Sequence, residues 1–408
     1  MRIGLFTDTY PPYINGVSTS VFMLKKALEK KEHKVFVITV NTEGHKYTLD
    51  DNNTVIRIPG IPIGIYDYRL ASVYPLKVIN IIKGWHLDVI HSHTEFSMGI
   101  FARLLAKQLN VPLVHTYHTL YEDYMHYITK GYFDKSSRKV AEYLSLFYCD
   151  KTATEFIVPT QKMYDIFKKK YHVQRNIHII PTGIEVERFY RENINFKNVD
   201  NLKRKYLVLK DEFVLLFVGR LAEEKNVVFL LDLMKDLLKK NMSFRLLIIG
   251  DGPDKEKYEK LAVKYRINHR VTFLGKIPWE QIPTYYQLAD VFITASLSET
   301  QGLTVVEAMA GGVTPICIDD EAFKSVVVDG LNGRIFKNRK EARLIIEDLY
   351  EHPDKLKRLD EQARVQAEHC SSKHYAEMIL DVYHHALNIY PKNRYGIFTS
   401  IIERIKGE

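Results

Sequence analysis

Two pairs of charged side chains in the second half of the chain have the types and the spacing of a binding site. Arg220 and Lys225 follow an apolar run at residues 213–218, and Glu299 and Glu307 stand with seven residues between them. The first pair offers two cations at a strand end, and the second offers a carboxylate on each side of a predicted helix start. Cations neutralise a diphosphate, and carboxylates accept hydrogen bonds from sugar hydroxyls. Together the pairs suit a ligand with a diphosphate in its middle and polyhydroxyl groups at both ends, which describes a nucleotide sugar.

The segment around the two glutamates predicts an anion-binding helix N-terminus. Residues 290–296 have the pattern of a buried strand and residues 303–310 that of a helix, so Gly302 lies at the helix start. Free backbone N–H groups and the helix dipole favour a phosphate there, and glycine has no Cβ to hold the phosphate away. Glu307 lies a little over one turn inside and points back toward a ribose. Glu299 precedes the helix and can face a hexose on the other side of the phosphates.

Each pair has an ordinary interpretation as well. Two glutamates at this spacing are more often surface residues, and two cations after a strand are common on solvated loops. The glycine between the glutamates and the strand–loop–helix context favour a site instead. A diphosphate leaving group gains charge as its bond to the sugar breaks, so cations held beside it stabilise the transition state more than the ground state.

These motifs resemble those of a known family. The Arg220/Lys225 pair, the E-x7-E element and a glycine loop near the N-terminus are similar to those of the retaining glycosyltransferases of family 4 over residues 1 to about 380. That family has the GT-B architecture. The segments HSHTEFSMG and HTYHTLYEDYMHYITKGY most resemble bacterial 1,2-diacylglycerol 3-alpha-glucosyltransferases.

The resemblance implies further site residues. Gly16 matches a glycine loop that reaches the donor phosphates, although the loop here is Asn-Gly-Val and not the double glycine of many members. His118 matches a histidine that contacts the transferred sugar, and the backbone of Lys276 and Ile277 matches the segment that pairs with the nucleobase. The predicted catalytic residues are His118, Arg220, Lys225 and Glu299. The predicted donor-binding residues are Gly16, Arg220, Lys225, Lys276, Ile277, Glu299, Gly302, Leu303, Thr304 and Glu307.

The resemblance also implies a reaction: transfer of an α-linked glucosyl group from UDP-glucose to the 3-hydroxyl of diacylglycerol, with retention and without a firmly identified enzymic nucleophile. Uracil is favoured over guanine only by the closer subfamily. Two alternatives stay open, namely another acceptor such as a glycolipid or a phosphatidylinositol headgroup, and a catalytically silent nucleotide-sugar-binding regulator. The intact set of four charged residues argues against a silent protein.

Length and periodicity predict an α/β protein of two domains. At 408 residues the chain exceeds the usual size of a single core. Short apolar runs alternate with helical segments throughout, which is typical of doubly wound parallel sheets covered by helices on both faces. We expect two Rossmann-like domains facing a cleft, at residues 1–195 for the acceptor and 196–375 for the nucleotide sugar. The resemblance implies that a helical tail, 376–408, crosses back to the first domain.

No metal site and no cofactor are expected. His91, His93 and His115 have no recognised ligand spacing, and the acidic pairs at residues 50–51 and 319–320 are adjacent, unlike a D-x-D motif. His115 is expected to face the core. The three cysteines, Cys149, Cys317 and Cys370, lie far apart, which favours reduced cytosolic thiols.

The charge distribution predicts a peripheral membrane protein of the cytoplasmic face. Residues 1–200 hold 26 Lys and Arg against 20 Asp and Glu, and the net charge of the whole chain is +8. An apolar stripe in residues 69–85 carries two lysines and suits an interfacial helix, although such stripes are more often core, and Lys168, Lys169 and Lys170 add positive charge. No apolar run is long enough to span a membrane, and neither a signal peptide nor a nucleic-acid motif is apparent. We therefore expect an anionic membrane surface as partner and no nucleic acid.

Overall fold

The structure is a computed structural model that describes residues 1–13, 15–41, 46–62, 69–72, 75–118, 152–240 and 243–406, with residues 391–406 as backbone only. The chain divides into two compact units. Unit 1 comprises Met1–Gly183 and Ser372–Glu408, and unit 2 comprises Ile184–Ser371.

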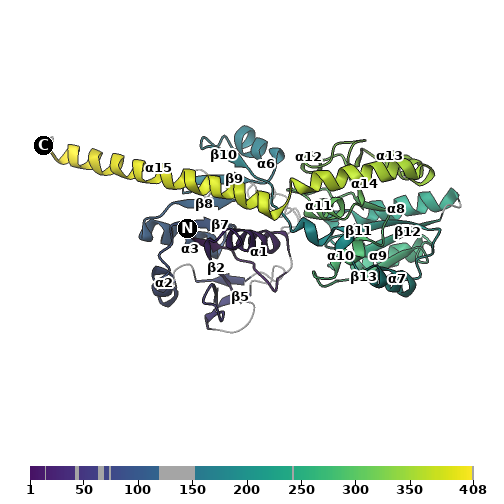
Figure 1. The fold of residues 1–408 in the computed structure, drawn as a ribbon, viewed down its shortest axis with the longest axis horizontal. Helices are drawn as coiled ribbons and strands as arrows, with labels where there is room; N and C mark the ends of the chain where they lie inside the picture. Colours follow the sequence, from purple (N-terminus) through teal and green to yellow (C-terminus); the bar gives the residue numbers. More distant parts are fainter. Residues whose placement is uncertain are drawn as a thin grey trace. The chain divides into compact units, whose positions relative to one another are not determined.

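The described part of unit 1 contains an eight-stranded sheet with the order β10-β9-β8-β7-β1-β2-β4-β3 (Figure 1). Its neighbouring strands are parallel, apart from the antiparallel pair β3 and β4. The strands are β1 (Arg2–Phe6), β2 (Lys34–Val40), β3 (Thr48–Leu49), β4 (Val55–Ile58), β7 (Val89–Ser92), β8 (Leu113–Thr116), β9 (Glu155–Val158) and β10 (Ile177–Ile179). A separate antiparallel hairpin joins β5 (Gly60–Pro62) and β6 (Arg69–Ala71).

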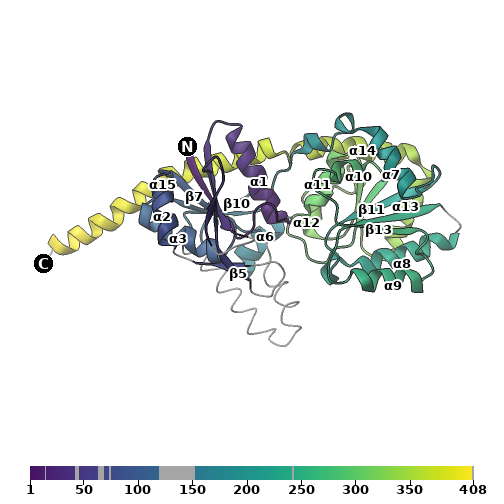
Figure 2. The ribbon, with the colours of Figure 1, turned by 90° about the horizontal axis from the view of Figure 1, so that it is seen from below.

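Helices cover both faces of this sheet. On one face α1 (Gly16–Glu29) and the first half of α15 (Ser372–Lys406) pack around buried Tyr375, Ile379 and Tyr383. On the other face lie α2 (Leu76–Lys83) and α3 (Ser97–Leu109). The short helix α6 (Gln161–Asp165) runs into a π-helix, η2 (Ile166–Lys170). Figure 2 shows α15 alongside the helices of unit 1, so the tail does return to that unit.

Unit 2 is a doubly wound parallel sheet with the order β13-β12-β11-β14-β15-β16. Its strands are β11 (Phe213–Val218), β12 (Phe244–Ile249), β13 (Val271–Gly275), β14 (Val291–Thr294), β15 (Thr314–Ile318) and β16 (Arg334–Phe336). One face is covered by α8 (Val227–Leu237), α9 (Lys255–Lys264) and α13 (Arg339–Glu351). The other face is covered by α7 (Phe196–Lys205), α10 (Ile282–Tyr286), α11 (Leu303–Ala310), α12 (Glu321–Lys324) and α14 (Pro353–Glu368). The predicted α/β class with two parallel-sheet units is confirmed.

The division between the units falls twelve residues before the predicted boundary, at 183/184 and not at 195/196. The reason is packing. Ile184, Val186 and Phe189 are buried in the core of unit 2, and the Ile184 N–H donates to the carbonyl of Cys370. The tail likewise rejoins unit 1 at Ser372, four residues before the predicted 376.

The apolar stripe at residues 69–85 is mainly core. Ile79, Ile82 and Trp85 are buried, and the Trp85 ring stacks on Phe36 with ring centroids 4.4 Å apart. Periodicity placed these side chains on one helix face, but that face is covered by the sheet. Among the members of this stripe, Leu76 is exposed.

Candidate active site

The four charged residues lie at the switch point of unit 2. The chain leaves β11 toward β12 on one side and returns as β14 on the other, so the loops after β11 and β14 diverge at the carboxyl edge of the sheet. Ligands of doubly wound sheets bind at such an edge. The two loops are bonded together, because the carbonyl of Glu224 accepts the Leu297 N–H at 2.8 Å. The topology explains why residues far apart in sequence meet here.

Lys225 and Glu299 form an ion pair across these two loops. Lys225 ends the short 3-10 helix η5 (Glu223–Lys225), and its Nζ lies 2.5 Å from Oε1 of Glu299. Both side chains are about four-fifths buried. Arg220 follows β11 directly, beyond Gly219. The structure thus brings one carboxylate against one of the two predicted cations at the edge of the sheet.

Gly302 has the backbone conformation that the predicted anion site needs. It is the N-cap of α11 with φ 78° and ψ 61°, in the left-handed region. A Cβ at this position would lie 2.7 Å from Cε1 of Phe323. Leu303 and Thr304 form the first turn of the helix, where backbone N–H groups have no partner within the helix.

We expect Gly302→Ala to lower the thermal midpoint of unfolding and to weaken UDP binding. A residue with a Cβ costs about 1–2 kcal/mol in the left-handed region, and the contact with Phe323 adds to that cost. Gly330→Ala is a matched control, because Gly330 has φ 76° but nothing within 4 Å of an added Cβ. Midpoints measured by calorimetry should fall further for Gly302→Ala. Equal falls in the two variants would show that the Phe323 contact is unimportant.

Glu307 is a buried carboxyl with a defined set of neighbours. It accepts a hydrogen bond from the Tyr286 hydroxyl at 2.8 Å and is 9% exposed. Burial raises its pKa to about 7, while the Tyr286 hydrogen bond and the charge of Arg188 act in the opposite direction. Glu307 is thus poised to change charge near neutral pH.

Sequence reasoning missed three residues around this carboxyl. Tyr286 lies on α10, Arg188 ends the 3-10 helix η3 (Val186–Arg188), and Trp279 follows β13. The guanidinium of Arg188 stacks on the Trp279 ring at 3.3 Å from its centroid. Burial lowers the pKa of Arg188. No spacing rule joins these residues to Glu307, because their meeting depends on how η3 and α10 pack against α11.

The predicted nucleobase segment follows β13 near the same residues. Gly275 ends the strand with φ 70°, and its carbonyl accepts the Gly250 N–H at 2.9 Å. Lys276 is exposed, and Ile277 packs partly against the core of unit 2. Trp279 continues this segment, so Lys276 and Ile277 lie within three residues of the ring under Arg188.

The other two predicted site residues belong to unit 1. Gly16 is the first residue of α1, whose N-cap Asn15 accepts the Ser18 N–H at 2.8 Å. His118 lies just beyond β8, and its Nε2 is 3.0 Å from Nδ1 of His93. Burial lowers the pKa of His118 to about 3, so its imidazole is neutral at physiological pH.

The other strand histidines are core residues of unit 1. His91 is hydrogen-bonded to Tyr383 and Thr116, at 2.7 Å each. His115 is hydrogen-bonded to Ser92 and Glu95, and it is fully buried. The core-facing position predicted for His115 is therefore confirmed. His93 is also fully buried, and its Nε2 has no hydrogen-bond partner among the residues that the structure describes.

Two doubly wound α/β units make up the GT-B fold, and unit 2 holds a basic pair and a helix N-terminus at its switch point. The family description "Glycosyl transferases group 1" matches residues 198–366, and "Glycosyltransferase Family 4" matches residues 14–188. The chain belongs to the family 4 glycosyltransferases, as the sequence motifs predicted.

Two curated relatives are similar to the chain over most of its length. The chain is 36% identical over 399 residues to an alpha-monoglucosyldiacylglycerol synthase of Acholeplasma laidlawii, covering 96% of this chain and 98% of the relative. It is 37% identical over 357 residues to the synthase of the same name from Streptococcus pneumoniae, covering 87% of this chain and 79% of the relative.

Solved structures support the fold. The Anabaena protein HepE in complex with UDP and glucose superposes with a TM-score of 0.72 at 16% identity, covering 94% of this chain and 99% of that one. Sucrose-phosphate synthase from Thermosynechococcus elongatus gives a TM-score of 0.76 at 20% identity, covering 95% and 99%.

Proposed function

We propose that this enzyme transfers a glucosyl group from UDP-glucose to the 3-hydroxyl of 1,2-diacylglycerol and forms an α-linkage with retention, a reaction of glycolipid synthesis. The observation that carries the proposal is the identity of 36% and 37% to two alpha-monoglucosyldiacylglycerol synthases across both units. The site of unit 2 supports it, because that site has the charges that a nucleotide sugar requires.

In this proposal the donor lies along the carboxyl edge of the unit 2 sheet. Arg220 and Lys225 neutralise the diphosphate, and the backbone of Gly302, Leu303 and Thr304 donates N–H groups to it. Glu307 binds the ribose hydroxyls, and Glu299 faces the hexose. Lys276 and Ile277 bind the uracil through their backbone. The family resemblance assigns Gly16 to the phosphates and His118 to the transferred sugar.

The chemistry requires the C1–O bond to the diphosphate to break while the acceptor oxygen attacks C1 from the same face. The acceptor proton passes to the leaving phosphate oxygen. Because the acceptor oxygen itself attacks C1, no side chain of the protein forms a bond to the sugar. Arg220 and Lys225 stabilise the charge that gathers on the diphosphate. His118 is neutral and hydrogen-bonds a sugar hydroxyl.

A panel of labelled nucleotide sugars and lipid acceptors tests the proposal. With 1,2-diacylglycerol as acceptor, label should be transferred faster from UDP-glucose than from GDP-mannose. With UDP-glucose as donor, label should be transferred faster to 1,2-diacylglycerol than to phosphatidylinositol or to a glucosylated lipid. Faster transfer to phosphatidylinositol or to a glycolipid would establish the alternative acceptor. Binding of the nucleotide sugar with no transfer to any lipid would establish the catalytically silent nucleotide-sugar-binding regulator.

The acceptor is a lipid, so we also propose peripheral attachment to the cytoplasmic membrane face. No helix among the described residues is long and apolar enough to cross a membrane. The exposed side of α2 carries Leu76, Lys77 and Lys83. The lysine cluster after α6 is partly engaged elsewhere, since Lys168 donates to the carbonyl of Val173 at 3.0 Å and Lys169 pairs with Asp165 at 2.9 Å.

We expect vesicle binding to need anionic lipid and to fall as salt rises, because surface charges are screened over a Debye length of about 10 Å at 0.1 M salt. Changing Lys77 and Lys83 together to Glu should reduce sedimentation with anionic vesicles and slow lipid glucosylation, while UDP affinity stays normal. The same change at the exposed Lys257 and Lys260 of unit 2 is the control. Equal binding to neutral and anionic vesicles would remove the electrostatic part of this proposal.

The proposed chemistry needs no metal, because the positive charge at the diphosphate comes from Arg220, Lys225 and the start of α11. Transfer measured at 25 °C should therefore persist after treatment with EDTA, within about twofold of the untreated rate. Activity that is lost in EDTA and restored by manganese alone would contradict this assignment of the positive charge.

A further inference from the structure

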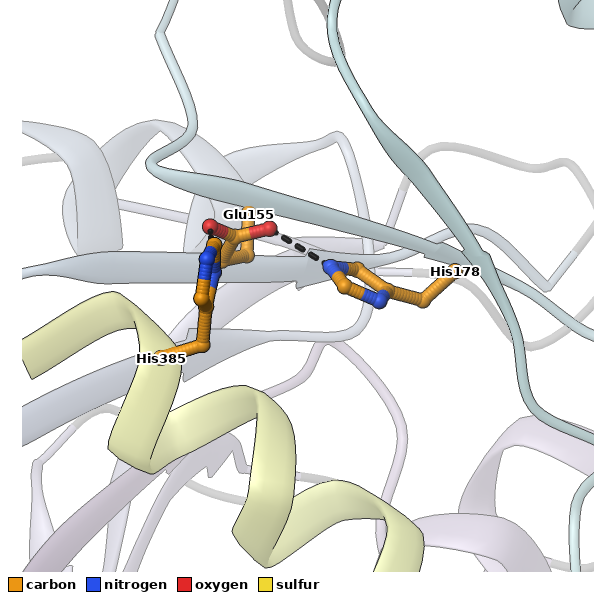
Figure 3. Close-up of side chains that lie close together, drawn as sticks. All are labelled: Glu155, His178 and His385. Atoms are coloured by element: carbon orange, nitrogen blue, oxygen red, sulfur yellow. Dashed lines mark hydrogen bonds and ion pairs between the residues drawn. The ribbon is translucent and has the colours of Figure 1, made fainter. Parts of the chain in front are cut away.

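A carboxylate and two imidazoles converge in unit 1, outside the proposed donor site (Figure 3). Glu155 begins β9, His178 lies on β10 and His385 lies on α15. Nε2 of His178 is 2.6 Å from one carboxylate oxygen of Glu155, and Nδ1 of His385 is 2.8 Å from the other. One ligand atom from each of the three residues lies within 4.8 Å of the others.

The sheet register explains why the three side chains share one face. His178 is paired with Ile157, which is two residues beyond Glu155 on the neighbouring strand. Residues two apart on a strand point to the same face. Ile157 packs in the core cluster that contains Tyr383 and Ala386 of α15, so this is the face that α15 covers. The cluster thus joins two strands to the C-terminal helix.

Burial differs among the three residues in a way that suits a metal ion. The Glu155 side chain is 3% exposed, whereas that of His178 is 24% and that of His385 is 53% exposed. The carboxylate therefore lies at the bottom of the cluster and the two imidazoles lie at its rim, which leaves an ion a path from solvent.

The donor set selects the class of ion. Two imidazole nitrogens and one carboxylate oxygen are ligands of zinc and its neighbours, while magnesium and calcium prefer oxygen alone. A tetrahedral zinc has ligands at about 2.0–2.2 Å, so the two rings need to turn by a small amount and the fourth position takes water. Neutral imidazoles offer lone pairs to the ion in place of the hydrogen bonds that they now make with Glu155.

We propose that Glu155, His178 and His385 bind a divalent transition-metal ion of the zinc type, which fastens α15 to the sheet of unit 1. The site is structural. Its three ligands come from segments that are distant in sequence, and none of them is among the residues proposed to bind the nucleotide sugar. A bound ion adds three coordinate bonds to a contact between α15 and the sheet that otherwise consists of side-chain packing and of hydrogen bonds, such as the one between Tyr383 and His91.

The test uses the full chain, stripped with EDTA and dialysed, and titrated with Zn²⁺ against a competing indicator. We expect one ion per chain with a Kd of about 1 µM or below. His385→Ala should weaken binding at least ~100-fold, and Glu155→Gln should do the same. His384→Ala is the matched control, since His384 is the exposed neighbour of His385 on the same helix and makes no part of the cluster.

Two further measurements separate this site from surface histidines. Zn²⁺ in excess should raise the thermal midpoint of the wild type and of His384→Ala by roughly 5 °C, and leave that of His385→Ala unchanged. Mg²⁺ at the same concentration should have no effect on any of them. Absence of micromolar Zn²⁺ binding, or binding that survives His385→Ala, would overturn the proposal and leave the three residues as a hydrogen-bonded contact. Loss of binding in the His384→Ala control would overturn it as well.

Discussion

Lys225→Ala should slow glucosyl transfer by at least ~100-fold, which corresponds to about 3 kcal/mol of transition-state stabilisation. The Lys225 ammonium stands at the switch point of unit 2, 2.5 Å from Glu299, where the diphosphate of the donor is proposed to lie. Without it the charge that develops on the leaving group loses one of its two cations. The loss should fall on kcat, measured with UDP-glucose and diacylglycerol at saturation, because the effect is largest in the transition state.

The control for this variant is Lys260→Ala, which removes a lysine from an exposed helix position of the same unit. Lys260→Ala should transfer glucose at the wild-type rate. Lys225 is about four-fifths buried and pairs with Glu299, so the thermal midpoint of Lys225→Ala is measured as well, and a midpoint well above the assay temperature shows that the slower transfer is not caused by unfolding. Near-normal transfer by Lys225→Ala would show that the diphosphate does not lie at this edge of the sheet.

Glu307→Gln should weaken the binding of UDP at least ~10-fold, because the amide offers a ribose diol one acceptor oxygen in place of two. Glu299→Gln should leave UDP affinity within about twofold of the wild type and lower kcat instead, since Glu299 is proposed to face the hexose. Calorimetric titration with UDP alone separates the two carboxyls. Equal losses of UDP affinity in both variants would contradict the proposed placement of ribose and hexose.

The raised pKa of Glu307 also predicts the direction in which UDP affinity changes with pH. The pKa of Glu307 is raised to about 7, so the carboxyl gains a proton and loses acceptor capacity as pH falls through that value. UDP affinity in the wild type should therefore decrease from pH 8 to pH 6, and Glu307→Gln should bind weakly at both. The Tyr286 hydrogen bond lowers the pKa of Glu307, so Tyr286→Phe should shift the midpoint of the decrease to higher pH. An unchanged midpoint in Tyr286→Phe would exclude Glu307 as the titrating group.

Sequence patterns predicted the sheets because buried parallel strands read as short apolar runs, of which β11 (Phe213–Val218) is one. The same patterns predicted the helix start at Gly302, between Glu299 and Glu307, and the structure has the N-cap of α11 at that residue. They did not predict where the first unit ends, since Ile184 and Phe189 carry no signal of the core that they join. Nor could they tell that Ile79 and Ile82 face a sheet, because an apolar helix face does not reveal what covers it.

Contacts between distant segments account for the rest of what sequence reasoning missed. Tyr286 bonds Glu307 because α10 packs beside α11, and Arg188 reaches Trp279 because η3 belongs to unit 2. The cluster of Glu155 and His385 joins residues 230 positions apart, a separation that no ligand-spacing rule covers. The hydrogen bonds that Lys168 donates to backbone carbonyls, such as that of Val173, could likewise not be predicted from a run of three lysines.

The central claim is tested most directly by the structure of the product made from UDP-glucose and 1,2-diacylglycerol. Proton NMR of the purified lipid should show one glucosyl group with the small coupling of an α-anomeric proton, attached through the 3-hydroxyl of the glycerol. That result would establish donor, acceptor and retention together. A β-anomeric proton would contradict retention, and the absence of any glucosylated diacylglycerol, with glucose transferred to another acceptor, would contradict the proposed reaction itself.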